Sequence, residues 1–352
     1  MSLQIGIVGL PNVGKSTLFR ALTKKQVPAE NFPFCTIDPN VGVVAVPDER
    51  LDKLTAISRS EETIPTAIEF VDIAGLVAGA HKGEGLGNKF LSHIREVDAI
   101  AHVVRDFKND KITHVENRID PKNDEEIILL ELAMADLSTV EKRFKDTQSK
   151  AKTGDKQASI ALGALEKIKT LLDAGKPARD ANLSEEERAS IKELSLITQK
   201  PILNVLNVAE ADINRQPEHE HEIVISAKIE SELSELSLED SRAMLADLGI
   251  NQTGLDKLIV ASYKLLDLIT FLTTGPKETR AWTVSKGATA PEAAGVIHTD
   301  FEKGFIRAEI ISYDDFITNN GELGAKEKGL VRLEGKNYIM QDGDICHFLH
   351  NN

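Results

Sequence analysis

Short apolar runs alternate with longer mixed segments in two parts of the chain, residues 1–122 and 199–277. Runs of this kind are typical of buried strands, and strands separated by helices indicate βαβ units and a largely parallel sheet. A helix is expected from about residue 15 to residue 23, directly after a glycine-rich turn. The predicted strands are residues 3–8, 41–46, 67–71, 99–104, 202–206 and 222–225.

Between residues 123 and 198 the apolar positions take a helical spacing. They recur at alternating intervals of three and four residues, in two series separated by the turn-forming Thr153-Gly154-Asp155. The pattern predicts two long antiparallel helices, packed either with a coiled-coil-like seam or as a plain helical hairpin. Ser184, followed by three glutamates, fits a capping box that starts a third helix, and this helix must end before Pro201. The two series are Leu130, Ala133, Leu137, Val140 and Phe144, then Ala158, Ala161, Leu165, Ile168 and Leu172.

The pattern changes again in the last part of the chain. Strand-like runs surround one short helix after Pro291, and the final run, residues 345–349, follows a turn at Asp342-Gly343-Asp344. This arrangement predicts a small β-rich domain. The helical block is then an insert between two strands of an α/β core. The three predicted parts are a core of residues 1–122 and 199–277, a helical insert of residues 123–198, and a β-rich domain of residues 278–352.

Composition limits the classes of protein to which this chain can belong. With 41% apolar and 28% charged residues, the 352-residue chain is close to an average soluble globular protein. No apolar run approaches the ~18 residues of a membrane helix, and the N-terminus lacks the features of a signal peptide. The only cysteines, Cys35 and Cys346, exclude a disulfide framework and favour a reducing compartment. We therefore expect a cytoplasmic protein without membrane contact.

The net charge of −14 argues against binding to nucleic acid through bulk charge, so an RNA contact would need a local basic patch. Residues 141–180 hold ten Lys or Arg and six Asp or Glu, whereas residues 279–352 hold eight and eleven. The helical insert is therefore the better candidate for an RNA contact, with a merely solvated helix face as the alternative. Its basic residues there include Lys142, Arg143, Lys145, Lys150, Lys152 and Lys156.

A phosphate-binding pattern follows the first predicted strand. Residues 9–16 read G-x-x-x-x-G-K-S and lie between a strand and a helix, which is the context of a P-loop. The glycines let backbone N–H groups curl around phosphate oxygens, and the N-terminus of the helix adds its dipole. Lys15 is then expected to neutralise the β- and γ-phosphates, and the hydroxyl of Ser16 can bind Mg²⁺.

Two further positions fit a Mg²⁺ and triphosphate site. Asp72 begins a D-x-x-G sequence, Asp72-Ile73-Ala74-Gly75, at the end of a predicted strand. Its carboxylate is expected to reach Mg²⁺ through water, while the amide of Gly75 senses the γ-phosphate. Thr36 lies between the two motifs, where a loop threonine can complete the Mg²⁺ ligands when a triphosphate is bound. An ordinary loop threonine is the alternative.

The segment expected to read the base departs from the GTPase pattern. GTPases usually carry N-K-x-D at the end of the next-to-last strand, and its aspartate accepts hydrogen bonds from N1–H and the 2-amino group of guanine. Here the matching residues are Asn207-Val208-Ala209-Glu210. A longer carboxylate replaces the aspartate, so guanine selectivity should fall and adenine becomes acceptable. Downstream, Ser226-Ala227-Lys228 matches the S-A-K loop, whose backbone touches the base.

The residue expected to orient the attacking water is also missing. Ras-type enzymes place a glutamine directly after D-x-x-G, and this chain has Leu76 there. Leucine cannot orient water, and the nearest polar candidate is His81, within a glycine-rich stretch from Gly79 to Gly87. The alternatives are a solvated loop histidine without a catalytic role, or water organised by K⁺ and the phosphates.

Taken together, these strings resemble the Obg-like, YchF-type ATPases of the translation-factor branch of P-loop GTPases. The resemblance covers nearly the whole chain, and its C-terminal strings are similar to a TGS domain, a ubiquitin-like β-grasp module. The N-x-x-E sequence is the feature that separates this subfamily from its GTP-using relatives. The matching segments are residues 9–19, 31–37, 72–77, 83–88, 293–301 and 304–309.

The resemblance implies ATP hydrolysis, a helical insert and a cytoplasmic role at the ribosome. It implies Mg²⁺ on Ser16 and Thr36, and K⁺ on Asn12, as in potassium-stimulated relatives. We therefore expect a Mg²⁺-dependent ATPase that acts as a conformational switch. A GTPase of the same mechanism, or a nucleotide-gated ribosome- or RNA-binding adaptor with incidental hydrolysis, is the alternative. The expected nucleotide-binding residues are Asn12, Val13, Gly14, Lys15, Ser16, Thr17, Asn207, Val208, Glu210, Ser226 and Ala227.

Overall fold

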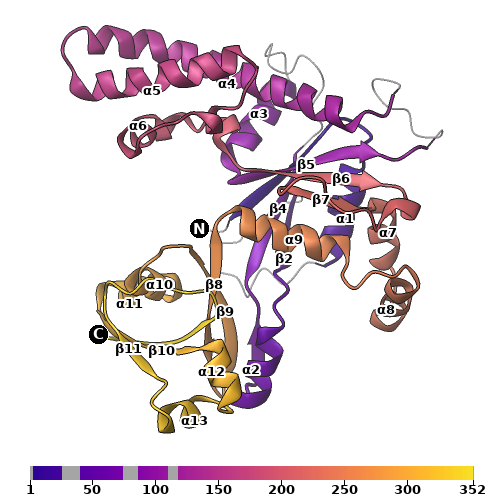
Figure 1. The fold of residues 1–352 in the computed structure, drawn as a ribbon, viewed down its shortest axis with the longest axis vertical. Coiled ribbons are helices and arrows are strands. Elements are labelled where there is room, and N and C mark those ends of the chain that lie inside the picture. Colours follow the sequence, from indigo (N-terminus) through magenta and orange to yellow (C-terminus); the bar gives the residue numbers. More distant parts are fainter. Residues whose placement is uncertain (1–2, 26–39, 74–85, 110–117, 352) are drawn as a thin grey trace. The chain divides into compact units, whose positions relative to one another are not determined.

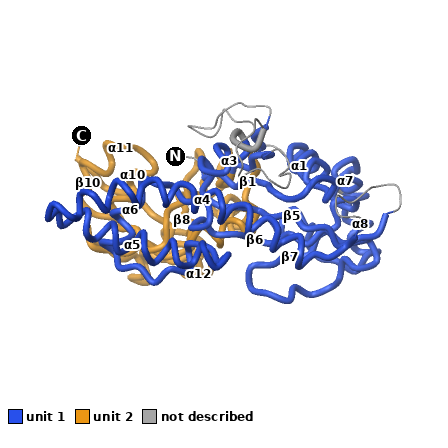
Figure 2. Tube along the Cα trace, turned by 90° about the horizontal axis from the view of Figure 1, so that it is seen from above, with its two compact units in different colours: residues 1–25, 36–42, 69–258 blue, residues 26–35, 43–68, 259–352 orange. Residues whose placement is uncertain are grey.

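The protein is described here from a computed structural model, which covers residues 3–25, 40–73, 86–109 and 118–351. Its backbone forms two compact units, coloured separately in Figure 2. Of the described residues, unit 1 contains 3–25, 40–42, 69–73, 86–109 and 118–258, and unit 2 contains 43–68 and 259–351. Each unit carries its own buried hydrophobic clusters.

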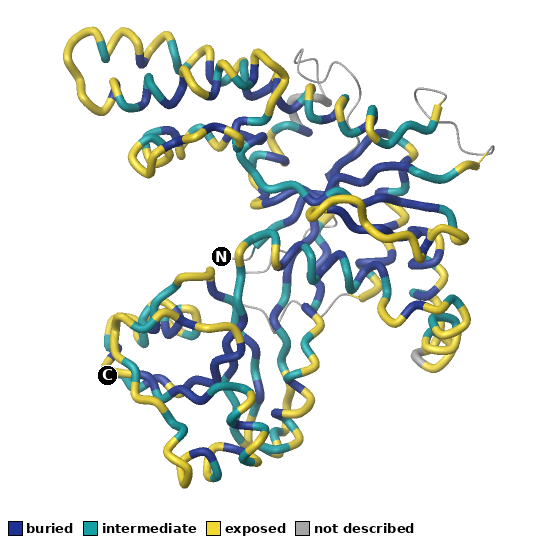
Figure 3. Tube along the Cα trace, viewed as in Figure 1, coloured by how far each residue is buried: buried dark blue, intermediate teal, exposed yellow. Residues whose placement is uncertain are grey.

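A six-stranded sheet has the order β2-β4-β1-β5-β6-β7 (Figure 1). β1 pairs in parallel with β4 and β5, β5 with β6, and β6 with β7, which confirms the predicted parallel sheet. β5 is buried along nearly its whole length, as expected for a parallel strand covered on both faces (Figure 3). The strands are β1 (Gln4–Val8), β2 (Val41–Ala45), β4 (Ala67–Asp72), β5 (Ala99–Asp106), β6 (Ile202–Val208) and β7 (Glu222–Ile225).

Helices connect these strands, because parallel neighbours need crossover segments. α1 packs beside α7, and buried Glu230 of α7 accepts hydrogen bonds from the N–H groups of Gly254 and Leu255 at the start of α9. The helices are α1 (Lys15–Lys24), α3 (Leu86–Glu96), α7 (Ala227–Leu233), α8 (Leu238–Asp247) and α9 (Gly254–Leu265), with a 3-10 turn η6 at Glu210–Asp212. Among the described residues, no helix is both long and apolar enough to cross a membrane.

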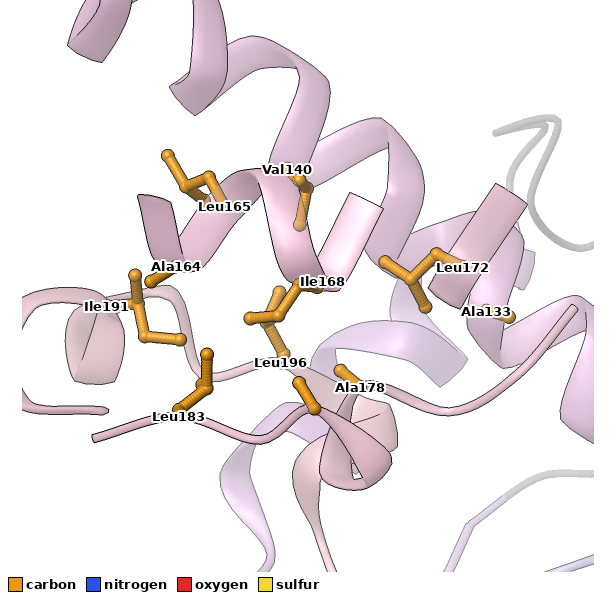
Figure 4. Close-up of a cluster of buried hydrophobic side chains, with 11 residues drawn as sticks. Ala133, Val140, Ala164, Leu165, Ile168, Leu172, Ala178, Leu183, Ile191 and Leu196 are labelled. Carbon is orange, nitrogen blue, oxygen red and sulfur yellow. The ribbon is translucent and has the colours of Figure 1, made fainter. Parts of the chain in front are cut away.

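The insert is a helical hairpin closed by a third layer. α4 (Pro121–Ala151) and α5 (Lys156–Asp173) run side by side, and α6 (Glu185–Ile191) packs against α5. Their shared core also takes in residues of the segment 178–196, so the two long helices alone do not close it, as they would in a two-stranded coiled coil (Figure 4). The predicted capping box is present: the Ser184 amide donates to Glu187 Oε2 at 2.9 Å, and the Glu187 amide donates to Ser184 Oγ at 3.2 Å.

A buried carboxylate joins α4 to the segment that leads from the insert into β6. Asp136 of α4 is fully buried and accepts hydrogen bonds from the backbone N–H groups of Ile197 at 3.0 Å and Thr198 at 2.7 Å. The hydroxyl of Thr198 donates to the same carboxylate at 2.7 Å. Burial raises the pKa of Asp136, and these hydrogen bonds act against that rise. The carboxylate thereby satisfies the short 3-10 turn η5 (Ile197–Gln199) just before the chain enters β6. Two further 3-10 turns in this segment are η3 (Ala178–Asp180) and η4 (Lys192–Leu194).

Unit 2 contains a mixed sheet of order β11-β10-β12-β8-β9-β3. β8 pairs antiparallel with β9 and parallel with β12, while β10 pairs antiparallel with β11 and β12. α10 (Ala290–Ile297) covers one face, where its alanines pack with Phe271 and Phe348. The strands are β3 (Glu62–Ile64), β8 (Leu268–Thr274), β9 (Glu278–Ser285), β10 (Phe305–Ser312), β11 (Arg332–Glu334) and β12 (Asp344–His350).

The structure of unit 2 differs from the sequence expectation in two ways. The C-terminal sheet begins at residue 268, before the predicted boundary at 278, and β3, from the predicted core, pairs with β9 at its edge. More than the one expected helix is present, because helices of five or six residues are too short to show a periodicity. The helices of this unit are α2 (Arg50–Ser58), α10 (Ala290–Ile297), α11 (Thr299–Lys303), α12 (Tyr313–Thr318) and α13 (Glu322–Glu327).

Candidate nucleotide-binding site

A cavity of about 780 Å³ lies where strands of the parallel sheet end. Its walls come from the segments that follow β1, β5, β6 and β7, which is where ligands bind in open α/β sheets. All the predicted nucleotide-binding residues except Val13 line this cavity. The lining residues are Asn12, Gly14, Lys15, Ser16, Thr17, Phe107, Lys108, Asn109, Asn207, Val208, Ala209, Glu210, Ser226, Ala227, Lys228, Ser231 and Glu232.

Two glycines make the loop before α1 possible. Gly9 and Gly14 have φ values of 153° and 106°, in a region that side chains disfavour. A Cβ on Gly9 would stand 2.3 Å from the carbonyl oxygen of Val103, and one on Gly14 would stand 2.3 Å from Nδ2 of Asn207. The two glycines of G-x-x-x-x-G are therefore required both by backbone conformation and by close packing on neighbouring strands.

Lys15 is buried, with its ammonium group held inside the loop. Nζ donates to the carbonyl oxygens of Gly9 at 2.9 Å and Leu10 at 2.7 Å, which accounts for two of its three donors. Burial lowers the pKa of Lys15 to about 8, and the charge of Asp72 acts in the opposite direction. The ammonium is thus a desolvated cation at a wall of the cavity, a setting in which a phosphate would be a favourable partner.

The first turn of α1 faces the cavity with small polar residues. Gly14 stands at the N-cap, and Ser16 and Thr17 follow in the first turn with exposed side chains. The first N–H groups of a helix have no partner within the helix, so they and the helix dipole favour an anion. This end of α1, together with Lys15, can therefore hold phosphate groups.

Ser16 and Asp72 are suited to holding Mg²⁺. Asp72 ends β4, its backbone N–H donates to the carbonyl of Asn40 at 2.9 Å, and its carboxylate interacts electrostatically with Lys15. Burial raises the pKa of Asp72, and the charge of Lys15 acts to lower it. Together with phosphate oxygens, one hydroxyl and one carboxylate would make the sparse oxygen set that Mg²⁺ prefers. The described part of the chain contains no group of three or more His, Cys, Asp or Glu side chains for a metal, and this set does not need one.

Asn207 connects the glycine loop before α1 to the segment that follows β7. Its side chain is buried, Nδ2 donates to the carbonyl oxygen of Val13 at 2.8 Å, and Oδ1 accepts from the N–H of Ala227 at 2.9 Å. Val13 therefore contributes its carbonyl to this brace, although it does not line the cavity. The first asparagine of N-x-x-E thus connects three of the segments that form the site.

The carboxylate of Glu210, the residue predicted to face the base, forms an ion pair. Oε1 of Glu210 lies 2.6 Å from Nζ of Lys228, and Glu232 lies 3.8 Å from the same ammonium. The hydrogen bond and charge of Glu210 raise the pKa of Lys228, which keeps the ammonium of Lys228 protonated at neutral pH. All three side chains line the cavity.

Several residues that line the cavity were not predicted from the sequence. Other predicted site residues lie outside the part of the chain that the structure describes. Thr36 and His81, like Gly75 and Leu76, are not among the described residues. The missed residues Phe107 to Asn109 directly follow β5, so the carboxyl end of a predicted central strand was the signal that could have found them. Ser231 and Glu232 were also missed, whereas Ala209 and Lys228 belong to the two base-side segments already identified in the sequence.

Comparison with known proteins agrees with this site and fold. A family model described as 50S ribosome-binding GTPase matches residues 4–134, and one of a YchF GTPase C-terminal domain, described as a protein of unknown function, matches residues 268–351. Over its full length the chain is 53% identical to all of the protein named ribosome-binding ATPase YchF from Bacillus subtilis. It is 55% identical to all of the protein of the same name from Haemophilus influenzae.

A solved structure supports the same assignment. The YchF GTPase of Schizosaccharomyces pombe is 38% identical and has a TM-score of 0.86, covering 99% of this chain and 98% of that one. The match extends over the parallel-sheet core, the helical insert and the C-terminal sheet. The P-loop at the end of β1, the N-x-x-E sequence at the end of β6, and full-length identity above one half lead to one conclusion: this chain belongs to the YchF family of P-loop GTPase-type proteins.

Proposed function

We propose that this protein is a Mg²⁺-dependent ATPase that hydrolyses ATP to ADP and phosphate and acts as a switch on the ribosome. The relatives from B. subtilis and H. influenzae carry the name ribosome-binding ATPase. The observation that carries the choice of nucleotide is the Glu210–Lys228 ion pair at the base side of the cavity. A carboxylate held by an ammonium is poorly placed to accept the two N–H groups that distinguish guanine.

Each part of the site has a role in this reaction. The amides at the start of α1 and the ammonium of Lys15 hold the triphosphate and stabilise negative charge on the transferred phosphoryl group. Ser16 and Asp72 would hold Mg²⁺, with Thr36 as a further ligand, and Asn12 would hold K⁺. When bound, Mg²⁺ supplies positive charge at the phosphate oxygens. We assign no arginine finger, so we expect slow basal turnover that a partner stimulates.

Purified protein is expected to bind ATP more tightly than GTP. The rival is a GTPase of the same mechanism, the name that the S. pombe relative carries. Titration with each nucleotide in Mg²⁺ buffer decides between them. A tenfold preference for GTP, about 1.4 kcal/mol, would reject the ATPase assignment. Glu210→Asp, which shortens the carboxylate to the length that guanine-reading sites use, should move the preference toward GTP.

The helical insert is our candidate for the ribosomal RNA contact. Lys145, Lys150 and Lys152 are exposed at the far end of α4 and the turn after it, whereas Arg143 forms an ion pair with Glu193 within the insert. Changing these three lysines to glutamate should weaken ribosome binding and reduce the slope of log affinity against log salt by roughly two. The measurement is ribosome co-sedimentation at several salt concentrations.

The matched control places the same charge reversal on unit 2. Lys286, Lys303 and Lys336 are exposed there, and changing them to glutamate alters the net charge equally. This control should leave ribosome affinity close to that of the parent. An equal loss of ribosome affinity in both variants would point to net charge rather than to the insert. Unchanged affinity in both would mean that the basic face of the hairpin is only solvated.

His81 is our candidate for the group that positions the attacking water. Because Leu76 cannot do so, His81→Ala should lower the single-turnover rate at least tenfold, about 1.4 kcal/mol of barrier, with ATP affinity nearly unchanged. Leu76→Ala should do less, since leucine offers no proton acceptor. If K⁺ near Asn12 organises the water instead, the single-turnover rate should be higher in K⁺ than in Na⁺. His81→Ala should then leave that rate nearly unchanged. Rates of both variants in each salt decide, and a His81→Ala rate within twofold of the parent removes histidine from the mechanism.

We also propose a domain type for unit 2 and a cellular location for the protein. The C-terminal strings at residues 293–301 and 304–309, together with a mixed sheet covered by α10, support a TGS-like β-grasp domain in unit 2. The domain boundaries at residues 123 and 199 stay predictions. A protein that works on ribosomes and carries two cysteines fits the cytoplasm.

A further inference from the structure

Arg105 is a buried arginine that no phosphate-binding or base-reading motif contains. It is 2% exposed, near the end of β5, and is not among the residues that line the cavity. Its guanidinium group bonds to the segment that follows the strand. Nε donates to the carbonyl oxygen of Phe107 at 3.1 Å, and Nη2 donates to that of Asn109 at 3.4 Å.

The same guanidinium also supports an aromatic ring. Its central carbon lies 4.5 Å from the centre of the Phe107 ring, within the range of a cation–π contact. Phe107, Lys108 and Asn109 form one wall of the cavity, and Val208, Ala209 and Glu210 also line it. Arg105 therefore contacts both the backbone of this wall and its aromatic ring, without itself lining the cavity.

The register of the sheet places Arg105 beside the strand that carries Asn207. It stands opposite Asn207 in the β5–β6 pairing, the residue whose side chain bonds to the phosphate loop. Burial lowers the pKa of Arg105, and the charge of buried Asp124, in the first turn of α4, acts against that. Burying a guanidinium costs desolvation free energy. Here the carbonyl acceptors, the ring face and the nearby carboxylate offset that cost.

We propose that Arg105 is a positioning residue that shapes the wall facing the nucleoside and so sets the affinity for the nucleoside part of the nucleotide. It acts through residues 107–109 and not through the phosphates, which the P-loop holds. The inference rests on the ATP binding proposed above. Arginine suits the role because its planar fork can bond two carbonyls while its face lies on a ring, and lysine cannot do both.

Arg105→Lys tests this, because it keeps the charge and loses the fork and the stacked face. We expect at least tenfold weaker ATP binding by equilibrium titration, with the single-turnover rate at saturating ATP within twofold of the parent. Arg179→Lys is the matched control. Arg179 also donates to two carbonyls, of Thr198 and Lys200, both at 3.3 Å, but lies in the insert and does not line the cavity. This control should bind ATP like the parent.

A double-mutant cycle shows whether Arg105 acts through the wall. In a Phe107→Ala background, adding Arg105→Lys should weaken ATP binding by less than threefold, because the main contact that the arginine positions is already absent. A full tenfold loss in that background would overturn the inference, as would ATP affinity within twofold of the parent in the single variant. A lowered rate at saturating ATP with unchanged affinity would also overturn it. If the parent itself binds no ATP, the proposed function fails; if the parent binds ATP and Arg105→Lys equals it, only this inference fails.

Discussion

Lys15→Met is expected to lower ATP turnover at limiting ATP by at least about 100-fold. The Lys15 ammonium is buried and lies against the carbonyls of Gly9 and Leu10, at the wall where the phosphates would bind. Leaving phosphate charge without this desolvated partner should cost about 3 kcal/mol or more, which corresponds to that factor. Steady-state turnover at low ATP and ATP titration are the measurements.

The same variant should fold as well as the parent. Burial lowers the pKa of Lys15 to about 8, which means that the folded protein disfavours the charge that methionine removes. The thermal midpoint should therefore stay the same or rise. Arg20→Met on the exposed side of α1 is the control, and its turnover should match the parent within twofold. If Lys15→Met kept turnover within fivefold of the parent, the P-loop assignment would be wrong.

The stability of unit 1 is expected to fall by about 3 kcal/mol as the pH is lowered from 7 to 4 because of His102 alone. His102 is buried in β5, opposite Val8 of β1 and Asn204 of β6. Burial lowers its pKa to about 4, with a smaller contribution from the charge of Lys15. Between the ordinary pKa of 6.5 and this value the unfolded chain binds a proton that the folded chain does not, so lowering the pH favours unfolding.

His102→Asn isolates this contribution, because asparagine does not titrate. The parent should lose about 3 kcal/mol more than the variant over this pH range, measured by urea unfolding. Circular dichroism is the suitable signal, since the single tryptophan, Trp282, lies in unit 2. His221→Asn, at an exposed position of unit 1, should keep the parental pH profile. Parallel profiles for the parent and His102→Asn would show that His102 does not remain neutral in the folded protein.

Features set by neighbouring residues could be predicted well. The strand at residues 222–225 and the start of α1 at Lys15 agree with the structure, because an apolar run and a glycine turn are local signals. The capping box at Ser184 is also local, since its partner Glu187 is three residues away. The same holds for the phosphate loop, where the glycine positions follow from backbone conformation within a few residues.

Pairings between distant residues could not be predicted in this way. The bond from Asn207 to Val13 joins positions 194 residues apart, and β3 pairs with β9 rather than with the core strands near it in the chain. The Glu210–Lys228 pair, the wall at Phe107 and its support by Arg105 likewise appear only once β5, β6 and β7 lie side by side.

The chain's own pattern thus determines which segments become strands, which turn can hold phosphate, and which residue replaces the guanine-reading aspartate. Those properties depend on backbone conformation and on residue type over a few positions. The tertiary structure decides which side chains line the cavity and which charges are paired or buried. Such contacts depend on strand order and register, and a linear pattern of apolar and polar positions is compatible with many strand orders, of which packing selects one.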